Sequence, residues 1–161
     1  MEDIFLRKTI ETEKIKTVLE KLFPDLTIFY YDFNFKKPKK LDLENPKHIF
    51  FHIINHYTDK SFDFEIRIYR TNSIEERARA LYIAQKLSFD YSISTMVPYV
   101  YLDPEHSVCK IIFEDNKTFI VEPDNTNIAN ADDDIDKNKK EYIINLLKFD
   151  TKADCIYLAK N

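Results

Sequence analysis

Three histidines stand at equal spacing in one short stretch of this chain. His48, His52 and His56 recur at every fourth position, and on a helix this spacing would bring three potential metal ligands to one face. The stretch HIFFHIINHY alternates with a period of two instead, which is typical of a strand. Along a strand, rings four residues apart are separated by about 13 Å, too far to share one ion. We therefore expect no metal ion and no cofactor here.

The histidine stretch is predicted to form one arm of a β-hairpin. Residues 48–57 and 62–70 both alternate with a period of two, and the turn residues Thr58–Ser61 join them. A symmetric turn sets the register on the apolar side, with Ile53 opposite Ile66 and Phe51 opposite Ile68. Because a slip of one residue would turn every side chain over, this register is a sharp prediction.

The polar side of the hairpin is a candidate acid–base site. The same register places His52 opposite Arg67 and His56 opposite Asp63. A carboxylate beside an imidazole can orient it as a general base. No nucleophile or oxyanion-binding turn accompanies these residues, so cross-strand charge pairing is the favoured interpretation. A small hydrolase that uses these four side chains is the alternative.

An acidic segment near the C-terminus is the second candidate site. From position 103 to position 136 the chain holds ten acids and only two lysines, Lys110 and Lys117. We predict a mobile loop at 123–138 that binds the cations of a partner protein and repels nucleic acids and anionic membranes. The proposed partner-binding residues are Asp124, Asp132, Asp133, Asp134 and Asp136.

The same segment imitates a calcium-binding loop, with oxygen-bearing side chains at the right offsets. They are Asn130, Asp132, Asp134, Asp136, Asn138 and Glu141. Ile135 occupies the position where the sharp turn of such a loop requires glycine. A solvated docking surface is therefore favoured over a calcium site.

A basic stretch follows a run of aromatic residues. Lys36–Lys40 contains four lysines and is preceded by the aromatic residues Tyr30, Tyr31, Phe33 and Phe35. This pairing is typical of single-stranded nucleic-acid binders. The aromatics alternate along an expected strand at 26–33, so most are expected in the core. Since the whole chain carries a net charge of −4, no nucleic-acid partner is expected.

The composition excludes several kinds of enzyme. The chain has no glycine among its 161 residues, which removes glycine-rich phosphate loops, dinucleotide-binding turns and glycine-flanked serine elbows. The N-terminal residues carry acids where a signal peptide needs cations, and no apolar run is long enough to span a bilayer. Cys109 and Cys155 both stand in apolar, strand-like context, so we expect small buried side chains in a cytoplasmic protein.

The elements predicted around these sites indicate a single α+β domain over residues 1–161, with about six strands in a mostly antiparallel sheet and two or three helices on one face. Helices are expected at 11–23, at 73–88 and at 139–149, and a β-meander at 95–122 with Asn116 in a left-handed turn. On the middle helix, Ile74, Ala78, Leu81 and Gln85 are expected to face inward, and Glu75, Arg79, Ile83 and Lys86 outward. A short final strand is expected at 155–158.

Two segments together resemble a known class of protein. One is the strand ending Ile66–Arg70 with the helix at 77–88, and the other is the strand pair 108–122 around its Glu-Asp-Asn-Lys turn. They look like the small acidic immunity proteins of bacterial polymorphic-toxin systems, which bind and block a cognate toxin. The resemblance implies a non-catalytic, cytoplasmic binding protein with a basic protein partner. It implies no catalytic residues, and the oligomeric state stays open.

Overall fold

The computed structural model describes residues 2–56, 61–69, 76–100, 108–121, 140–142, 145–146 and 158–159. These residues form a sheet of eight strands, a separate pair of strands and two helices. The strands are β1 (Glu2–Leu6), β2 (Thr27–Tyr30), β3 (His48–Asn55), β4 (Phe64–Tyr69), β5 (Thr95–Val100), β6 (Val108–Glu114), β7 (Lys117–Val121), β8 (Lys140–Tyr142), β9 (Asn145–Leu146) and β10 (Leu158–Ala159). The helices are α1 (Thr12–Leu22) and α2 (Glu76–Tyr91).

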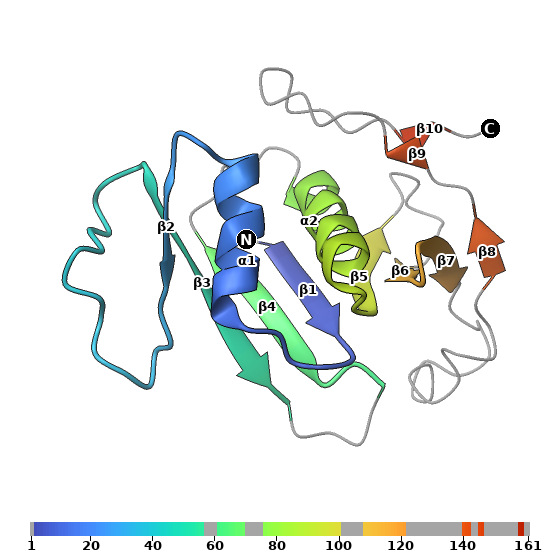
Figure 1. The fold of residues 1–161 in the computed structure, drawn as a ribbon, viewed down its shortest axis with the longest axis horizontal. Coiled ribbons are helices and arrows are strands. Elements are labelled where there is room, and N and C mark those ends of the chain that lie inside the picture. The colour runs from blue at the N-terminus through green and yellow to red at the C-terminus, as the bar shows by residue number, and fades with distance from the viewer. Residues whose placement is uncertain are drawn as a thin grey trace.

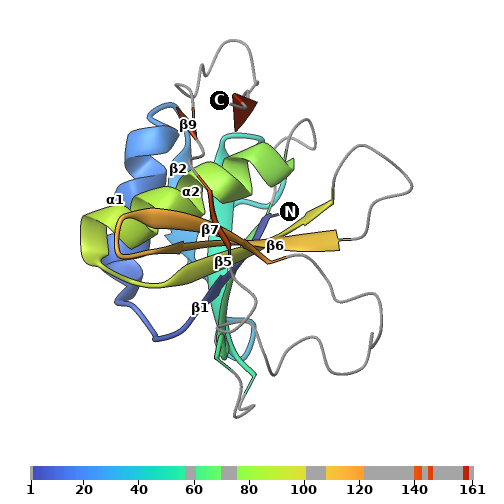
Figure 2. The same cartoon turned by 90° about the vertical axis from the view of Figure 1, so that its right-hand side faces the viewer.

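The order of the large sheet is β2-β3-β4-β1-β5-β6-β7-β8. Only β2 and β3 run parallel, and all other described neighbours are antiparallel. Both helices lie on one face of this sheet (Figures 1 and 2). The α+β class and the mostly antiparallel sheet are therefore confirmed, with eight strands in place of about six and two described helices.

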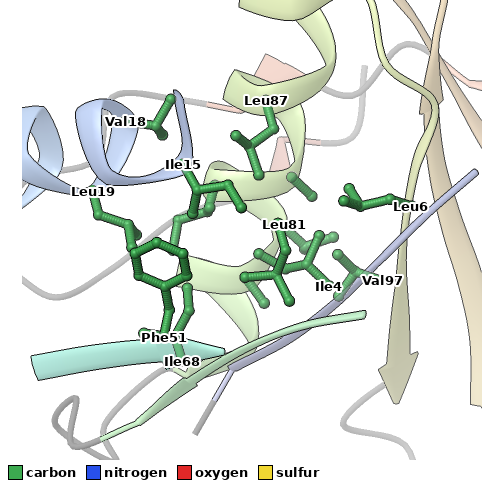
Figure 3. Packing of buried hydrophobic residues seen from close by; sticks show 14 of the residues in the cluster. Ile4, Leu6, Ile15, Val18, Leu19, Phe51, Ile68, Leu81, Leu87 and Val97 are labelled. Carbon is green, nitrogen blue, oxygen red and sulfur yellow. The ribbon is translucent and has the colours of Figure 1, made fainter. Parts of the chain in front are cut away.

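The main core lies between the two helices and the inner face of the sheet. Ile15 and Leu19 of α1 and Leu81 of α2 are fully buried there (Figure 3). They pack over the strands where Phe51 of β3 and Ile68 of β4 are buried as well. The 3.6-residue period of α1 predicted this apolar stripe correctly. Neither described helix is long and apolar enough to cross a membrane.

The strand at the N-terminus was not expected from the sequence. β1 lies in the middle of the sheet and joins the β2-β3-β4 half to the β5–β8 half. Its inner face consists of Glu2, Ile4 and Leu6, all at most 1% exposed. Because Glu2, the first residue of β1, is charged and yet buried, the sequence of this strand does not show the apolar–polar alternation that normally indicates a strand.

The predicted hairpin register is confirmed. Phe51 pairs with Ile68, His52 with Arg67 and Ile53 with Ile66. The N–H of His56 donates to the carbonyl oxygen of Asp63 at 2.9 Å, which continues the same register beyond the strand ends. The period-two pattern therefore fixes which side chains reach each face.

The predicted outward face of α2 needs correction. Leu81 is buried as expected, but Arg79 and Ile83 are 4% and 0% exposed. Nε of Arg79 donates to Oε1 of Glu2 at 2.6 Å, so the arginine is buried as an ion pair with β1. The helical period placed Arg79 on the outward face because an unpaired charge is not expected in a core. Its pairing with Glu2 makes the buried position possible.

The predicted C-terminal helix at 139–149 is also wrong. Residues 140–142 form β8, which extends the sheet beside β7, and residues 145–146 form β9, which pairs with β10. Pairing with an open strand edge has overridden the weak local helix pattern. The final strand is described from Leu158, and the rest of its predicted span lies outside the described residues.

The turn between β6 and β7 provides a first prediction. Asp115 and Asn116 both have positive φ, of 50° and 60°, as a tight hairpin turn of primed type requires. Asn116→Ala should lower the free energy of unfolding by about 1 kcal/mol, because a Cβ without a side-chain amide is disfavoured at positive φ. Urea unfolding measures this effect. Asn116→Gly is the control, and equal losses in both variants would contradict the explanation.

Candidate functional site

The polar candidate site lies on the outer face of the sheet, opposite the two helices. Alternation along β1, β3 and β4 brings Asp3, His56, Glu65 and Arg67 to this face, because their neighbours Ile4, Phe51, Ile66 and Ile68 point into the core. The site is thus built from three adjacent strands, one of which the sequence pattern did not reveal.

Glu65 connects the charged groups of the site. Its side chain is only 2% exposed, and its two carboxylate oxygens contact two different residues. Oε1 accepts from Nε and Nη2 of Arg67, at 2.9 and 2.6 Å, and Oε2 lies 2.7 Å from Nε2 of His56. Nε of Arg67 also donates to Oδ1 of Asp3 at 3.0 Å. The result is a continuous chain from Asp3 through Arg67 and Glu65 to His56.

The ring partner of His56 is Glu65 and not Asp63, which corrects the predicted pair. Asp63 meets His56 through its main-chain carbonyl. Glu65 reaches the ring across the diagonal of the two strands, because Arg67 holds its carboxylate in place beside it. The ring also stacks on Phe5, with the centroids 6.2 Å apart. Glu65 stands two residues after Asp63, the residue directly opposite His56, so a rule that includes diagonal neighbours predicts this contact from the sequence.

His52 belongs to a different cluster. Its Nε2 lies 3.6 Å from Oδ1 of Asp32, which follows β2. The ring of Phe33 stands edge-on to it, with the centroids 5.3 Å apart. The structure therefore joins two of the four predicted residues, His56 and Arg67, in one network, while His52 contacts the segment after β2.

Charge fixes the protonation of the arginine in this network. Burial alone would lower the pKa of Arg67, but hydrogen bonds from its guanidinium to Glu65 and the charges of Glu65 and Asp3 raise it above its ordinary value. Arg67 therefore remains a cation. Burial, together with the charge of Glu65, raises the pKa of Asp3, and the Arg67 charge only partly opposes this.

This shift predicts how pH acts on stability. The folded protein holds the Asp3 proton more tightly than the unfolded chain, so the Asp3 contribution to stability falls as pH rises above the usual aspartate pKa. In urea unfolding between about pH 3 and pH 7, the wild type should therefore lose stability relative to Asp3→Asn. Asp25→Asn is the control for removal of an exposed aspartate. The explanation is contradicted if the stability difference between the wild type and Asp3→Asn stays constant as pH rises, or if it shifts in favour of the wild type.

An aromatic cluster adjoins the network on the same face. The rings of Phe50 and Tyr69 stack with their centroids 4.8 Å apart. The ring of Phe33 stands edge-on to both, at 5.9 and 5.4 Å, and edge-on to Tyr31 at 5.0 Å. Phe33 thus fastens the loop between β2 and β3, residues 31–47, to the sheet.

The expectation that most of these aromatics are core residues is wrong. β2 ends at Tyr30, and the chain after it leaves the sheet. Five large apolar side chains are exposed among the described residues, and four of them lie at the end of β2 or in the loop that follows. They are Tyr30 (38%), Phe33 (50%), Phe35 (72%) and Leu43 (41%), and the fifth is Phe89 of α2 (38%). We call Phe33, Phe35 and Leu43, together with Lys36–Lys40, the loop surface. Tyr30 does not belong to it, because its ring lies 5.5 Å from that of the inner-face residue Phe51 and it lines the groove described next.

An open groove of about 850 Å³ lies on the other face of the sheet. Its lining comes from the start of α1, from β3 and β4 and from the end of α2, and includes Lys8, Ile10, Lys14, Ile53, Phe64 and Tyr91. Ile53 and Phe64 point away from His56, since successive residues of a strand face opposite sides. This groove therefore does not open onto the histidine network.

The acidic candidate residues are not placed by the structure. Asp124, Asp132, Asp133, Asp134 and Asp136 lie outside the described residues. Within the ranges that are described, no three potential ligands come close enough to hold a metal ion. The acidic segment stays a prediction from the sequence.

Comparisons with known proteins give no match. No protein-family model matches the chain, and neither the curated proteins nor the solved structures provide a similar one.

Proposed function

We propose that this chain is a non-catalytic protein-binding module, of the immunity or inhibitor type, that uses the loop surface to contact its partner. The observation that carries the proposal is that one loop holds three of the five large exposed apolar side chains of the described residues, Phe33, Phe35 and Leu43, with Phe35 72% exposed. Burial of one such side chain against a partner would stabilise the complex by about 1.5–3 kcal/mol. Contiguous apolar side chains with a polar rim are a mark of protein interfaces.

The loop surface is held in place before any partner binds. Phe33 packs on the sheet aromatics, and Leu41 is 2% exposed inside the loop. A fixed surface loses less conformational entropy on binding than a flexible one, so its exposed side chains are suited to serve as anchors. We include the acidic residues Asp132–Asp136 in the proposal as a second contact that speeds association with cations of the partner.

Affinity capture from the native host tests the proposal. Phe35→Ser/Leu43→Ser should lose a protein that the wild type retains, while Phe89→Ser, an exposed phenylalanine outside the loop surface, should retain it. With that protein purified, changing Asp132, Asp133, Asp134 and Asp136 together to asparagine should slow association at low salt. The proposal fails if Phe35→Ser/Leu43→Ser captures the same protein as the wild type to the same extent.

A small hydrolase remains a second candidate because of one contact. The buried Glu65 carboxylate lies 2.7 Å from Nε2 of His56, and the histidine side chain is 38% exposed. This pair is able to serve as an oriented general base. Within the described part of the chain, the ring forms its hydrogen bond to Glu65 and to no serine, threonine or cysteine. Ester hydrolysis that is lost in His56→Gln would support this candidate over simple binding.

A further inference from the structure

The positive charge of the loop surface is concentrated in Lys36–Lys40. Lys36, Lys37, Lys39 and Lys40 flank or follow the exposed ring of Phe35, and all four are exposed. None of them forms an ion pair with another described residue. Asp32, before the lysines, is engaged elsewhere, since its Oδ1 accepts from the main-chain and side-chain nitrogens of Asn34 and lies 3.6 Å from Nε2 of His52. The loop therefore presents four cations within five residues, with Asp32 before them and Asp42 after them in the chain.

Hydrogen bonds hold the lysine segment at both ends. The N–H of Phe35 donates to the carbonyl oxygen of Asp32 at 2.9 Å, which closes a turn before the lysines. After them, the N–H of Leu41 donates to the carbonyl oxygen of Pro38 at 3.0 Å, and the Leu41 side chain is buried. These two turns set the course of the backbone on either side of the lysines, and the loop between β2 and β3 lies beside the β2 edge of the sheet (Figure 1).

The composition of the loop surface favours a protein over a polyphosphate. Leu43 has no ring on which a base can stack, and it stands between Asp42 and Glu44 in the chain, whose negative charges would repel the phosphates of a strand bound there. In a protein interface an isolated acid at the rim is tolerated, and leucine and phenylalanine both fill apolar pockets. The net charge of −4 also opposes the high charge density of a nucleic acid.

We propose that the loop surface docks onto an acidic patch of the partner protein, with Phe35 inserted as the central anchor and Lys36–Lys40 around it. This inference rests on the proposed function and specifies the chemistry of the partner. Complementary charge sets the rate and orientation of encounter, while the buried ring sets the lifetime of the complex.

Synthetic anionic probes test the chemistry without knowledge of the partner. Fluorescence anisotropy would compare polyglutamate, a random copolymer of glutamate and tyrosine, a single-stranded thymidine oligonucleotide, and vesicles of phosphatidylserine and phosphatidylcholine. The wild type should bind the copolymer roughly tenfold more tightly than polyglutamate, and Phe35→Ser should remove this difference. Changing Lys36, Lys37, Lys39 and Lys40 to glutamine should weaken binding of both polypeptides by roughly tenfold or more at low salt.

The matched control changes three lysines outside the loop surface, Lys8, Lys16 and Lys21, to glutamine, and should leave binding of the probes nearly unchanged. Equal weakening in this control would overturn the inference. Tighter, Phe35-dependent binding of the oligonucleotide or the vesicles would also overturn it, because the surface would then serve another class of ligand. If the lysine variant leaves probe binding unchanged while Phe35→Ser/Leu43→Ser abolishes capture, this inference fails and the proposed function stands.

Discussion

Arg79→Leu should lower the free energy of unfolding by about 3–5 kcal/mol, the usual loss when one partner of a buried ion pair is removed. The two side chains of the pair, Glu2 and Arg79, are 0% and 5% exposed, and their contact at 2.6 Å joins β1 to α2. Without the arginine, the buried Glu2 carboxylate would lose this charge-paired contact beneath the helix. Urea unfolding followed by circular dichroism measures the loss.

The double variant Glu2→Leu/Arg79→Leu is the matched control. Because well-packed apolar residues often replace a buried ion pair at little cost, the double variant should regain most of the stability lost in Arg79→Leu. A small effect of Arg79→Leu, or a double variant that is even less stable, would show that the ion pair does not hold β1 against α2.

Phe51→Ala should be comparably destabilising, by about 3–5 kcal/mol, the range for truncation of a buried aromatic. Phe51 is 0% exposed and lies opposite Ile68 on the inner face of the hairpin, below α1 (Figure 3). Its removal leaves a cavity directly behind the strand that carries His52. Thermal and urea unfolding both measure the change.

The exposed Phe35 provides a control of the same residue type. Phe35→Ala should alter the free energy of unfolding by less than about 0.5 kcal/mol, as is usual for surface positions. The contrast matters for function, because binding losses in Phe35 variants are interpretable only if the fold is intact. Similar losses of stability in Phe51→Ala and Phe35→Ala would mean that Phe35 belongs to the core and is no binding anchor.

The sequence was a good guide where one physical rule dominated locally. The hairpin register followed from the period-two alternation of β3 and β4, and the left-handed turn at Asn116 followed from the lack of glycine. The apolar stripe of α1 followed from its 3.6-residue period. In each case the local preference and the tertiary environment agree.

The sequence was a poor guide where a distant residue changed the local rule. Glu2 and Arg79 both resemble solvent-facing residues until they are paired across the core. The helix expected at 139–149 gave way to edge pairing with β7. Likewise, the ring of His56 contacts Glu65 in place of Asp63. Arg67 holds the Glu65 carboxylate in position by donating to its other oxygen. Glu2 and Arg79 lie 77 residues apart and leave no local pattern, whereas Glu65 and Arg67 lie two residues apart and are within reach of a rule for diagonal neighbours.

Photocrosslinking from position 35 in the native host is the most direct measurement for the proposal as a whole. A benzophenone amino acid placed at Phe35 should form one discrete covalent adduct with a protein on irradiation, and the same amino acid at Phe89 should not. If position 35 yields no protein adduct, or yields adducts with nucleic acid only, then the braced phenyl ring and its surrounding ammonium groups are not a protein-docking surface.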